Sequence, residues 1–307
     1  MFSVIIPVHN GEKTLRRCVN SLVPQAEEIL LIENGSKDNS RALCHELERE
    51  YANVTAIDGD SVGGVSRARN AGLDAATQKY ILFCDCDDYV EPDYTDAFRK
   101  ALSLAEFAVC GYINHDEAAA GRTDIYGFEA AETVDVIKKL EMLHEKCLLQ
   151  QLWNKVFCRD IIREHQIRFD ESISIGEDMR FVLTYLEKAC PEVTMLIPKP
   201  LYHYMRDQPG SLMYRMGTER MEEAIINLAA MYRLGGLSED GIEERMMEER
   251  EKQKGLYAYL IMHNMGMPFR QRRELILQLD HKQGKQLFWK NLVLFLKEQA
   301  VRYIAHR

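Results

Sequence analysis

The sequence predicts an α/β fold in which helices flank a mostly parallel sheet, followed by a helical C-terminal region. In the first part of the chain, short runs rich in β-branched residues alternate with helical patterns, which is typical of a parallel sheet covered on both faces. Beyond residue 211 the pattern changes to long helical periods rich in Met, Glu and Arg. We place the boundary near residue 215, which gives an α/β domain over 1–215 and a helical region over 216–307.

The expected elements of the first part follow in βα order. Each strand is a short apolar run, followed by a turn and by apolar residues at helical spacing. The first helix carries Leu15, Cys18, Val19 and Leu22 on one face. We expect strands at 2–7, 28–33, 54–57 and 80–84, and expect the next three helices to end near residues 51, 76 and 105.

The later elements of the first part are less regular. A strand is expected at 107–112, and the polar stretch 115–127 predicts a hairpin or a loop. A helical pattern covers 134–149, and a mixture of aromatic residues, charges and short turns covers 152–178. The apolar run 193–198 predicts a late strand.

Length and composition limit the classes of function. The 307 residues are enough for one large α/β domain and an accessory region, and 46% hydrophobic residues can form a buried core. The net charge of -9 argues against nucleic acid as a partner, because a surface that follows a phosphate backbone is usually basic. Eight cysteines occur without Cys-x-x-Cys spacing, which indicates reduced thiols in a cytoplasm rather than disulfides or a zinc site.

The two ends of the chain set expectations about location. The segment Met1–Pro7 has no basic leader, and no apolar stretch is long enough to span a bilayer, so we expect a cytoplasmic protein. The segment 282–307 carries mostly basic charges around Leu287, Phe288 and Trp289. Three alternatives stay open for a helix here: peripheral contact with the anionic inner face of the membrane, packing on the first domain, or contact with a second subunit of a homo-oligomer.

A group of acidic residues at the end of the fourth strand is the most informative feature of the sequence. Asp85, Asp87 and Asp88 follow the apolar run Tyr80–Cys84. Such a strand delivers its acids to the carboxyl edge of the sheet, where open α/β folds bind ligands. A divalent cation, Mg²⁺ or Mn²⁺, stabilises crowded carboxylates and keeps coordination positions free for phosphate oxygens. The alternative is that Asp87 or Asp88 caps the following helix.

Several segments together resemble the ordered motifs of family 2 glycosyltransferases. They share that family's order, spacing and placement at strand ends, and the likeness covers roughly the first two thirds of the chain. The resemblance implies a GT-A-type (Rossmann-like) fold, a nucleotide-sugar donor and inversion of the anomeric centre. The segments are Ser3–Asn10, Ile32–Ser40, Gly64–Gly72, Asp85–Asp88, Trp153–Phe157 and Ile175–Phe181.

The resemblance also implies which residues bind the donor and the cation. Asp87 would coordinate the Mg²⁺ or Mn²⁺ ion that bridges the two phosphates, and Asp85 would contact the ribose or a metal-bound water. Glu33 stands where the family usually has Asp. The donor-binding residues expected from the resemblance are Pro7, Val8, Asn10, Glu33, Arg69, Asp85, Lys155, His203 and Arg206.

The acceptor side needs a base that removes a proton from the attacking hydroxyl. Asp178 is the predicted base, because Gly176-Glu177-Asp178 matches the family's Glu-Asp motif and begins a helix, whose positive end favours an ionised carboxylate. Glu177 would orient the loop or the acceptor, and Trp153 would stack on a sugar. The alternatives are a helix-capping acid pair and a Trp in the core.

Together these expectations describe a metal-dependent hexosyl- or N-acetylhexosaminyltransferase. Its donor would be UDP-linked, its acceptor a hydroxyl of a glycan or lipid-linked molecule, and its role the synthesis of a cell-surface polysaccharide. Two rivals stay open. One is a nucleotidyltransferase on a related fold, although the segment His9–Lys13 is a poor phosphate loop. The other is a non-catalytic sugar-nucleotide sensor, which the unusual Glu33-Asn34 pair and the helical tail favour.

Overall fold

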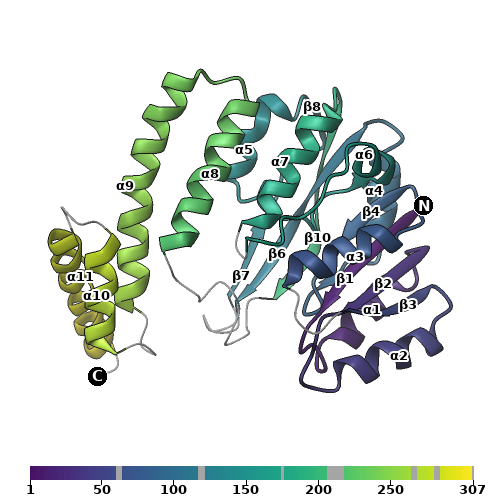
Figure 1. The fold of residues 1–307 in the computed structure, drawn as a ribbon, viewed down its shortest axis with the longest axis horizontal. Helices are drawn as coiled ribbons and strands as arrows, with labels where there is room; N and C mark the ends of the chain where they lie inside the picture. The colour runs from purple at the N-terminus through teal and green to yellow at the C-terminus, as the bar shows by residue number, and fades with distance from the viewer. Residues whose placement is uncertain are drawn as a thin grey trace. The chain divides into compact units, whose positions relative to one another are not determined.

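The chain forms two compact units, Met1–Pro209 and Gly210–Arg307 (Figure 1). The structure is a computed structural model, and it describes residues 1–59, 64–116, 122–173, 176–205, 218–263, 268–279 and 284–305. The predicted boundary near residue 215 and the predicted donor-binding residue Arg206 lie outside these described residues.

The first unit contains a mostly parallel sheet, as predicted. Its strand order is β3-β2-β1-β4-β9, and only β9 runs antiparallel to its neighbour. The central strand β1 is buried along its whole length, as expected of a strand covered on both faces. The bounds are β1 Phe2–Val8, β2 Glu28–Glu33, β3 Val54–Asp58, β4 Tyr80–Phe83 and β9 Phe157–Cys158.

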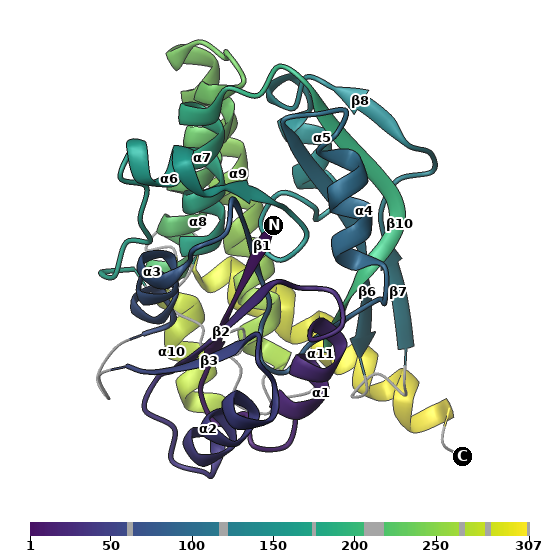
Figure 2. The ribbon, with the colours of Figure 1, turned by 90° about the vertical axis from the view of Figure 1, so that its right-hand side faces the viewer.

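Three helices cover the two faces of this sheet. Helices α1 (Leu15–Leu22) and α2 (Ser40–Glu50) lie on one face and α3 (Val65–Ala75) lies on the other (Figure 2). The four apolar residues predicted to face the core from α1 are all buried. Helix α3 packs very closely on β1, because a Cβ at Gly72 would lie 2.3 Å from the Ile5 side chain. This close packing brings α3 against the strand next to the acidic segment.

A second sheet extends the first unit. Its strand order is β5-β10-β6-β7, with β8 also paired to β10, and β10 runs parallel to β6. The predicted late strand, 193–198, corresponds to the first part of the longer β10. Strand β10 pairs with β5, which directly follows the acidic segment, so β10 runs beside the acids. The bounds are β5 Tyr89–Val90, β6 Phe107–Asp116, β7 Arg122–Tyr126, β8 Glu132–Val134 and β10 Thr194–Met205.

The helix predicted over 134–149 is wrong in its first part. The segment begins with β8 and a short 3-10 helix, Ile137–Lys139, and the α-helix is limited to α5 (Leu140–Glu145). Pairing of β8 with β10 overrides the local helical pattern, since tertiary context outweighs propensity. The remaining helices of this unit are α4 Tyr94–Ala101, α6 Arg159–Glu164 and α7 Glu177–Ala189.

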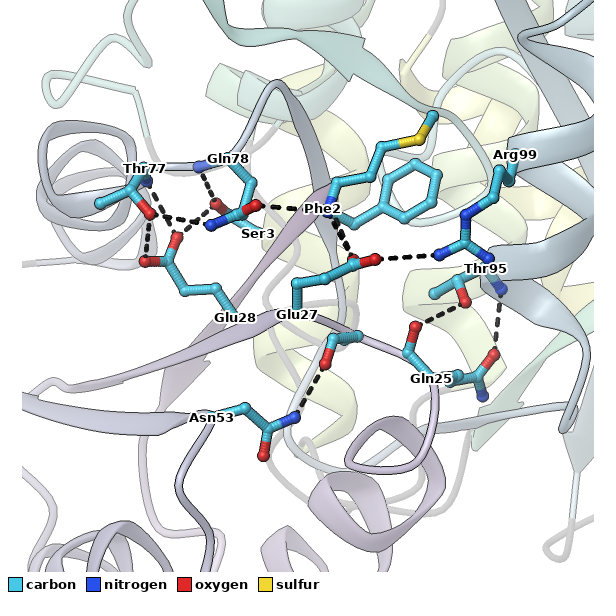
Figure 3. Close-up of polar contacts among 12 residues, drawn as sticks. Phe2, Ser3, Gln25, Glu27, Glu28, Asn53, Thr77, Gln78, Thr95 and Arg99 are labelled. Carbon is cyan, nitrogen blue, oxygen red and sulfur yellow. Dashed lines mark hydrogen bonds and ion pairs between the residues drawn. The ribbon is translucent and has the colours of Figure 1, made fainter.

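A network of polar contacts holds the amino-terminal edge of the first sheet (Figure 3). Glu27 Oε2 accepts a hydrogen bond from the Phe2 N–H at 2.9 Å. Glu28 accepts hydrogen bonds from the hydroxyls of Ser3 and Thr77. Glu28 therefore holds β1 to the segment before β4, and Glu27 joins β1 to Arg99. The acids of the predicted site follow the opposite, carboxyl ends of the strands.

The second unit is helical, as predicted. Helices α10 and α11 pack on the C-terminal half of α9 around a small core of Ala258, Ile261, Met262, Ile276 and Phe288 (Figure 1). None of the described helices combines the length and the hydropathy that a bilayer span requires. The bounds are α8 Thr218–Leu234, α9 Glu239–His263, α10 Phe269–Leu279 and α11 Gly284–Ala305.

Candidate active site

Asp88, the last acid after β4, is a structural residue. It is fully buried, and its carboxylate accepts hydrogen bonds from the Tyr202 hydroxyl at 2.6 Å and from the Met205 N–H at 2.7 Å. Burial, together with the charges of Asp87 and Asp85, raises the pKa of Asp88 well above its ordinary value. Asp88 therefore connects the end of β4 to β10, and it leaves Asp85 and Asp87 as the two partly exposed acids of the group.

Asp85 and Asp87 supply carboxylates that suit a divalent cation. Burial, together with the negative charge of Asp85, raises the pKa of Asp87 from 3.8 to about 6. A cation beside them would offset this repulsion, and hard oxygen ligands suit Mg²⁺ or Mn²⁺. Within the described part of the chain, no three His, Cys, Asp or Glu side chains surround one metal position. Binding of a cation by Asp85 and Asp87 stays a prediction.

Arg69 brings together acids from two distant parts of the chain. Its side chain, on α3, is 5% exposed. Nη1 donates hydrogen bonds to Asp178 at 2.6 Å and to Glu177 at 3.2 Å, and Nη2 donates to Asp85 at 3.4 Å. Burial lowers the pKa of this guanidinium, but the three carboxylates outweigh burial and raise it. One buried cation therefore connects the acids after β4 to the acids that begin α7.

The start of α7 places Glu177 and Asp178 against Arg69. The preceding residue, Gly176, has a φ of 83°, in the left-handed region that residues with a Cβ rarely adopt. The helix begins directly after this turn, so both acids occupy its first turn. The local sequence Gly-Glu-Asp therefore determines the point at which the chain enters the helix and presents its acids.

The pKa of Asp178 is raised despite the contact with Arg69. Burial raises the pKa, Arg69 lowers it, and Glu177 and Asp85 raise it again, so that it lies at about 8. The expectation that the positive end of the helix keeps this carboxylate ionised is thus outweighed by burial and by two neighbouring acids. A carboxylate with a pKa near neutral pH is well suited to accept a proton.

A group of aromatic rings fixes α7 to β4 next to these acids. Phe169 stacks on Phe181 of α7, with ring centroids 4.2 Å apart. Both rings meet Phe83 of β4 edge-on, at 5.6 and 5.8 Å. The Arg69 guanidinium lies 5.5 Å from the centroid of Phe169. Packing of these rings therefore limits how far Asp178 can move relative to Arg69.

Asn70 holds the chain segment that carries Phe169. Its side-chain oxygen accepts a hydrogen bond from the Phe169 N–H at 2.9 Å, and its Nδ2 donates to the Phe169 carbonyl at 3.0 Å. Nδ2 also donates to Glu171 at 3.1 Å. The Asn70 amide thus makes the two backbone hydrogen bonds of Phe169 that a neighbouring strand would otherwise make. It also ties the segment before α7 to α3, the helix that bears Arg69.

The residues expected to line the nucleoside pocket lie at the ends of β1 and β2. Pro7 and Val8 are buried in β1, and Glu33 ends β2 with 3% exposure. Glu33 accepts a hydrogen bond from the Ser36 N–H at 2.6 Å, and Asn10 donates its own N–H to the Ser36 hydroxyl at 3.0 Å. These contacts hold the turn after β2 against the end of β1. Their contact with a donor stays a prediction.

Lys155 has protein partners, and its predicted donor contact stays untested. Its side chain is fully buried, and Nζ donates hydrogen bonds to the carbonyls of Leu148 and Gln151 and to Asn154 Oδ1, all within 2.6–2.7 Å. These acceptors use all three N–H groups of the ammonium. Burial lowers the pKa of Lys155 to about 7. The lysine therefore supports the backbone before β9.

Trp153 lies in the core of the first unit, and its predicted contact with a sugar stays untested. The indole is 4% exposed and stacks on Tyr202 with centroids 4.2 Å apart. It meets Tyr112 edge-on at 4.8 Å. The alternative, a Trp in the core, describes this residue, because its rings pack against the strands of the second sheet.

His203 has protein partners at both ring nitrogens. Nε2 lies 2.7 Å from Glu91 Oε1, and Nδ1 lies 2.9 Å from His115 Nε2. The ring also stacks on Tyr89 with centroids 4.2 Å apart. A direct contact with phosphate or metal would require one of these hydrogen bonds to break, so the predicted donor contact stays untested.

Sequence reasoning assigned no role to several residues of this site. Asn70 lies inside the segment Gly64–Gly72 that carried the resemblance, so its position was visible although its contacts were not, whereas Tyr202 lies in none of these segments. Glu91 and His115 carried no local signal, because both meet His203 only after β10 pairs with β5 and β6.

Known proteins resemble this chain in sequence. EpsJ of Bacillus subtilis (strain 168), described as an uncharacterized glycosyltransferase, is 28% identical over 219 residues, which cover 69% of this chain and 62% of EpsJ. The minor teichoic acid biosynthesis protein GgaB of the same organism is 28% identical over 229 residues, which cover 68% of this chain and 23% of GgaB. The chain thus spans less than two thirds of the length of either relative.

Solved structures resemble it in fold. The crystal structure of S. aureus TarS 1-349 in complex with UDP-GlcNAc matches with a TM-score of 0.64 and 17% identity, covering 94% of this chain and 88% of that chain. This similarity confirms the predicted GT-A-type fold. The family described as Glycosyl transferase family 2 matches residues 3–158. Because this match covers about half of the chain, the protein belongs to the family 2 glycosyltransferases.

Proposed function

We propose that this protein transfers a sugar, with inversion, from a UDP-sugar to a hydroxyl of a glycan or lipid-linked acceptor, in the synthesis of a cell-surface polysaccharide. The observation that carries the proposal is the bridge at Arg69, which contacts Asp85 of the donor-side motif and Asp178 of the acceptor-side motif. The UDP-GlcNAc bound by TarS supports a uridine nucleotide, and the role named for GgaB supports a surface polymer.

Asp178 acts as the general base in this proposal. It takes the proton of the acceptor hydroxyl while that oxygen forms a bond to the anomeric carbon. The bond from this carbon to the diphosphate oxygen breaks on the opposite face, and the anomeric centre is inverted. Arg69 positions the base, because Nη1 holds the Asp178 carboxylate at 2.6 Å.

Asp85 and Asp87 would hold the Mg²⁺ or Mn²⁺ ion. When bound, such an ion neutralises the charge that develops on the departing diphosphate. Arg69 keeps Asp85 in place through its second nitrogen, so the same guanidinium serves both sides of the reaction. Asp88 contributes through its contacts with β10, which fix the backbone of the acidic segment.

Asp87→Asn is expected to remove the metal-dependent part of UDP binding and to stabilise the metal-free protein. The folded pKa of Asp87, about 6, lies above its ordinary value of 3.8, so ionisation of this carboxylate destabilises the fold. The free energy of unfolding of the variant should exceed that of the wild type by about 1–2 kcal/mol above pH 6, and the difference should vanish below about pH 4.

Calorimetry of UDP with and without Mn²⁺, and thermal unfolding at acid and alkaline pH, check both effects. The control is Asp96→Asn, because Asp96 has a 60% exposed side chain that pairs only with Arg99 among the described contacts. UDP binding by the Asp87 variant with the metal dependence of the wild type would contradict the cation site.

Asn70→Ala is expected to lower kcat by roughly 10–100-fold with little change in KM for the donor. The reason is that Asn70 holds the segment before α7 and thus the position of Asp178. Asn53→Ala is the control, since Asn53 Nδ2 also donates two hydrogen bonds, here to backbone carbonyls at 2.8 and 3.1 Å, but at the amino-terminal edge of the sheet. An equal loss of kcat in both variants would show that Asn70 contributes only to stability.

The function itself is tested by incubating the protein with a panel of UDP-sugars, Mn²⁺ and candidate acceptors while UDP release is measured. Acceptor-dependent UDP release supports the proposal. Release of pyrophosphate instead would indicate a nucleotidyltransferase, and donor binding without turnover of any donor would indicate a non-catalytic sensor.

A further inference from the structure

Helix α11 presents exposed apolar side chains on one face. Trp289 is 62% exposed, Val293 49% and Leu294 42%, and Phe269 at the start of the neighbouring α10 is 47% exposed. Trp289 and Val293 lie four residues apart and so share one face of the helix. Exposed apolar residues that occur singly need no explanation, but a cluster on one helix face marks a surface for contact.

Cations surround these apolar residues. Lys285 and Lys290 on α11 are exposed. Lys285 lies four residues before Trp289 and Lys290 lies four residues before Leu294, so each lysine neighbours one of these apolar side chains on the helix surface. Across residues 268–295 the sequence contains six Arg and Lys residues and two acidic ones, in a chain whose net charge is -9. We call the surface formed by Phe269, Lys285, Trp289, Lys290, Val293 and Leu294 the α10–α11 surface.

The opposite face of α11 already has a partner. Phe288, 5% exposed, packs into the core shared with Ile276 of α10 and Met262 of α9. Its ring meets Phe269 edge-on at 5.9 Å and Trp289 at 5.5 Å. The α10–α11 surface is therefore held on a packed three-helix core, and its exposed side chains are not needed to complete that core.

The acidic and the basic residues of the second unit lie in different segments. The segment Glu239–Glu251 contains seven acidic and two basic residues, whereas α10 and α11 pack on the other end of this helix (Figure 1). From Glu251, the last acid of this segment, to Ala258 the helix rises by roughly 10 Å, about the Debye length in physiological salt, and the other six acids lie farther from Ala258. Screening therefore weakens the effect of the acidic segment on the cations of the α10–α11 surface.

We infer that the α10–α11 surface binds an anionic lipid bilayer, with α11 lying in the plane of the interface. Trp and aliphatic side chains suit the boundary between headgroups and acyl chains, and the lysines suit anionic headgroups. Among the described helices none can span a bilayer, so this surface would bring the enzyme to a lipid-linked acceptor without a membrane span. The inference concerns the second unit and does not require the proposed reaction.

The two tryptophans of the chain allow a direct test. Trp153 is buried in the first unit, so a change in emission on lipid binding reports Trp289. The full chain is mixed with vesicles made of equal parts of phosphatidylglycerol and phosphatidylcholine, and with vesicles of phosphatidylcholine alone. We expect the wild type to cosediment with the anionic vesicles and its tryptophan emission to shift to the blue. A Trp289→Phe variant should cosediment without this shift in emission.

Three variants separate the apolar and ionic contributions. Trp289→Ser is expected to abolish cosedimentation, and Lys285→Gln with Lys290→Gln to weaken it by about 20-fold. The control is Leu104→Ser, because Leu104 is 69% exposed but lies in the first unit, and it should bind vesicles like the wild type. Circular dichroism of each variant checks that the helices are retained.

Several outcomes would overturn the inference. One is the absence of any blue shift and cosedimentation with anionic vesicles. Another is equal binding to phosphatidylcholine alone, which would remove the role of the lysines. A third is a dimer in light scattering that Trp289→Ser dissociates while vesicles do not bind, which would assign the surface to a second copy of this chain.

Discussion

Asp178→Asn should lower sugar transfer by about 10²–10⁴-fold while UDP binding changes little. The amide cannot accept the proton of the attacking hydroxyl, whereas Asp85 and Asp87 on the donor side are unchanged. Initial rates of UDP release, together with calorimetry of UDP, measure the two effects. Asp160→Asn is the matched control, because Asp160 is an acid of the same unit with a 71% exposed side chain.

The wild-type rate is also expected to rise with pH through about 8. Below this pH the Asp178 carboxyl holds its proton and cannot act as a base, because burial and two neighbouring acids raise its pKa. The residual activity of the Asn variant should lack this rise. A variant that keeps wild-type turnover, or a wild-type rate that does not increase over this range, would contradict the assignment of the base.

Arg69→Met is expected to lower the free energy of unfolding by about 3–5 kcal/mol, because it leaves the carboxylates of Asp85, Glu177 and Asp178 close together without their cation. The loss should be largest at alkaline pH and smaller at acid pH, where protonated carboxyls no longer repel one another. Urea unfolding at both pH values measures this difference. Arg69→Lys should recover part of the stability, since one ammonium keeps the charge but cannot reproduce the forked contact.

Arg67→Met provides the comparison on the same helix. Arg67 is 50% exposed and pairs with Glu171 at 3.2 Å, so its loss should cost less than about 1 kcal/mol, as is typical of surface ion pairs. Equal losses of stability in the two variants would show that the three acids do not depend on Arg69.

The strands and the first helices could be predicted because their signals are local. The run 29–32 is apolar between Glu28 and Glu33, and the buried residues of α1 recur at helical spacing, so both elements were placed correctly. The segment 134–149 was misassigned for the opposite reason. Its first residue, Val134, ends β8, which forms because β10, about 60 residues later, offers an edge for pairing.

The site was predicted in part. Motif resemblance pointed to Asp85, Asp87, Arg69 and Asp178, and the structure shows that Arg69 contacts the first and the last of these. The surroundings of Lys155 could not be predicted. The resemblance implied a donor contact, which stays untested, whereas the structure shows three local acceptors around its buried Nζ.

The sequence by itself determined the βα order, the position of the acids at a strand end and the family to which the chain belongs, because periodicity and motif spacing are properties of neighbouring residues. Only the tertiary structure decided that Asp88 holds β10, that Asn70 holds the segment before α7 and that one guanidinium joins Asp85 to Asp178. The tertiary structure also decided the raised pKa of Asp178, because burial is its largest cause. Contacts between distant segments and the removal of water from a charged group exist only after the chain has folded.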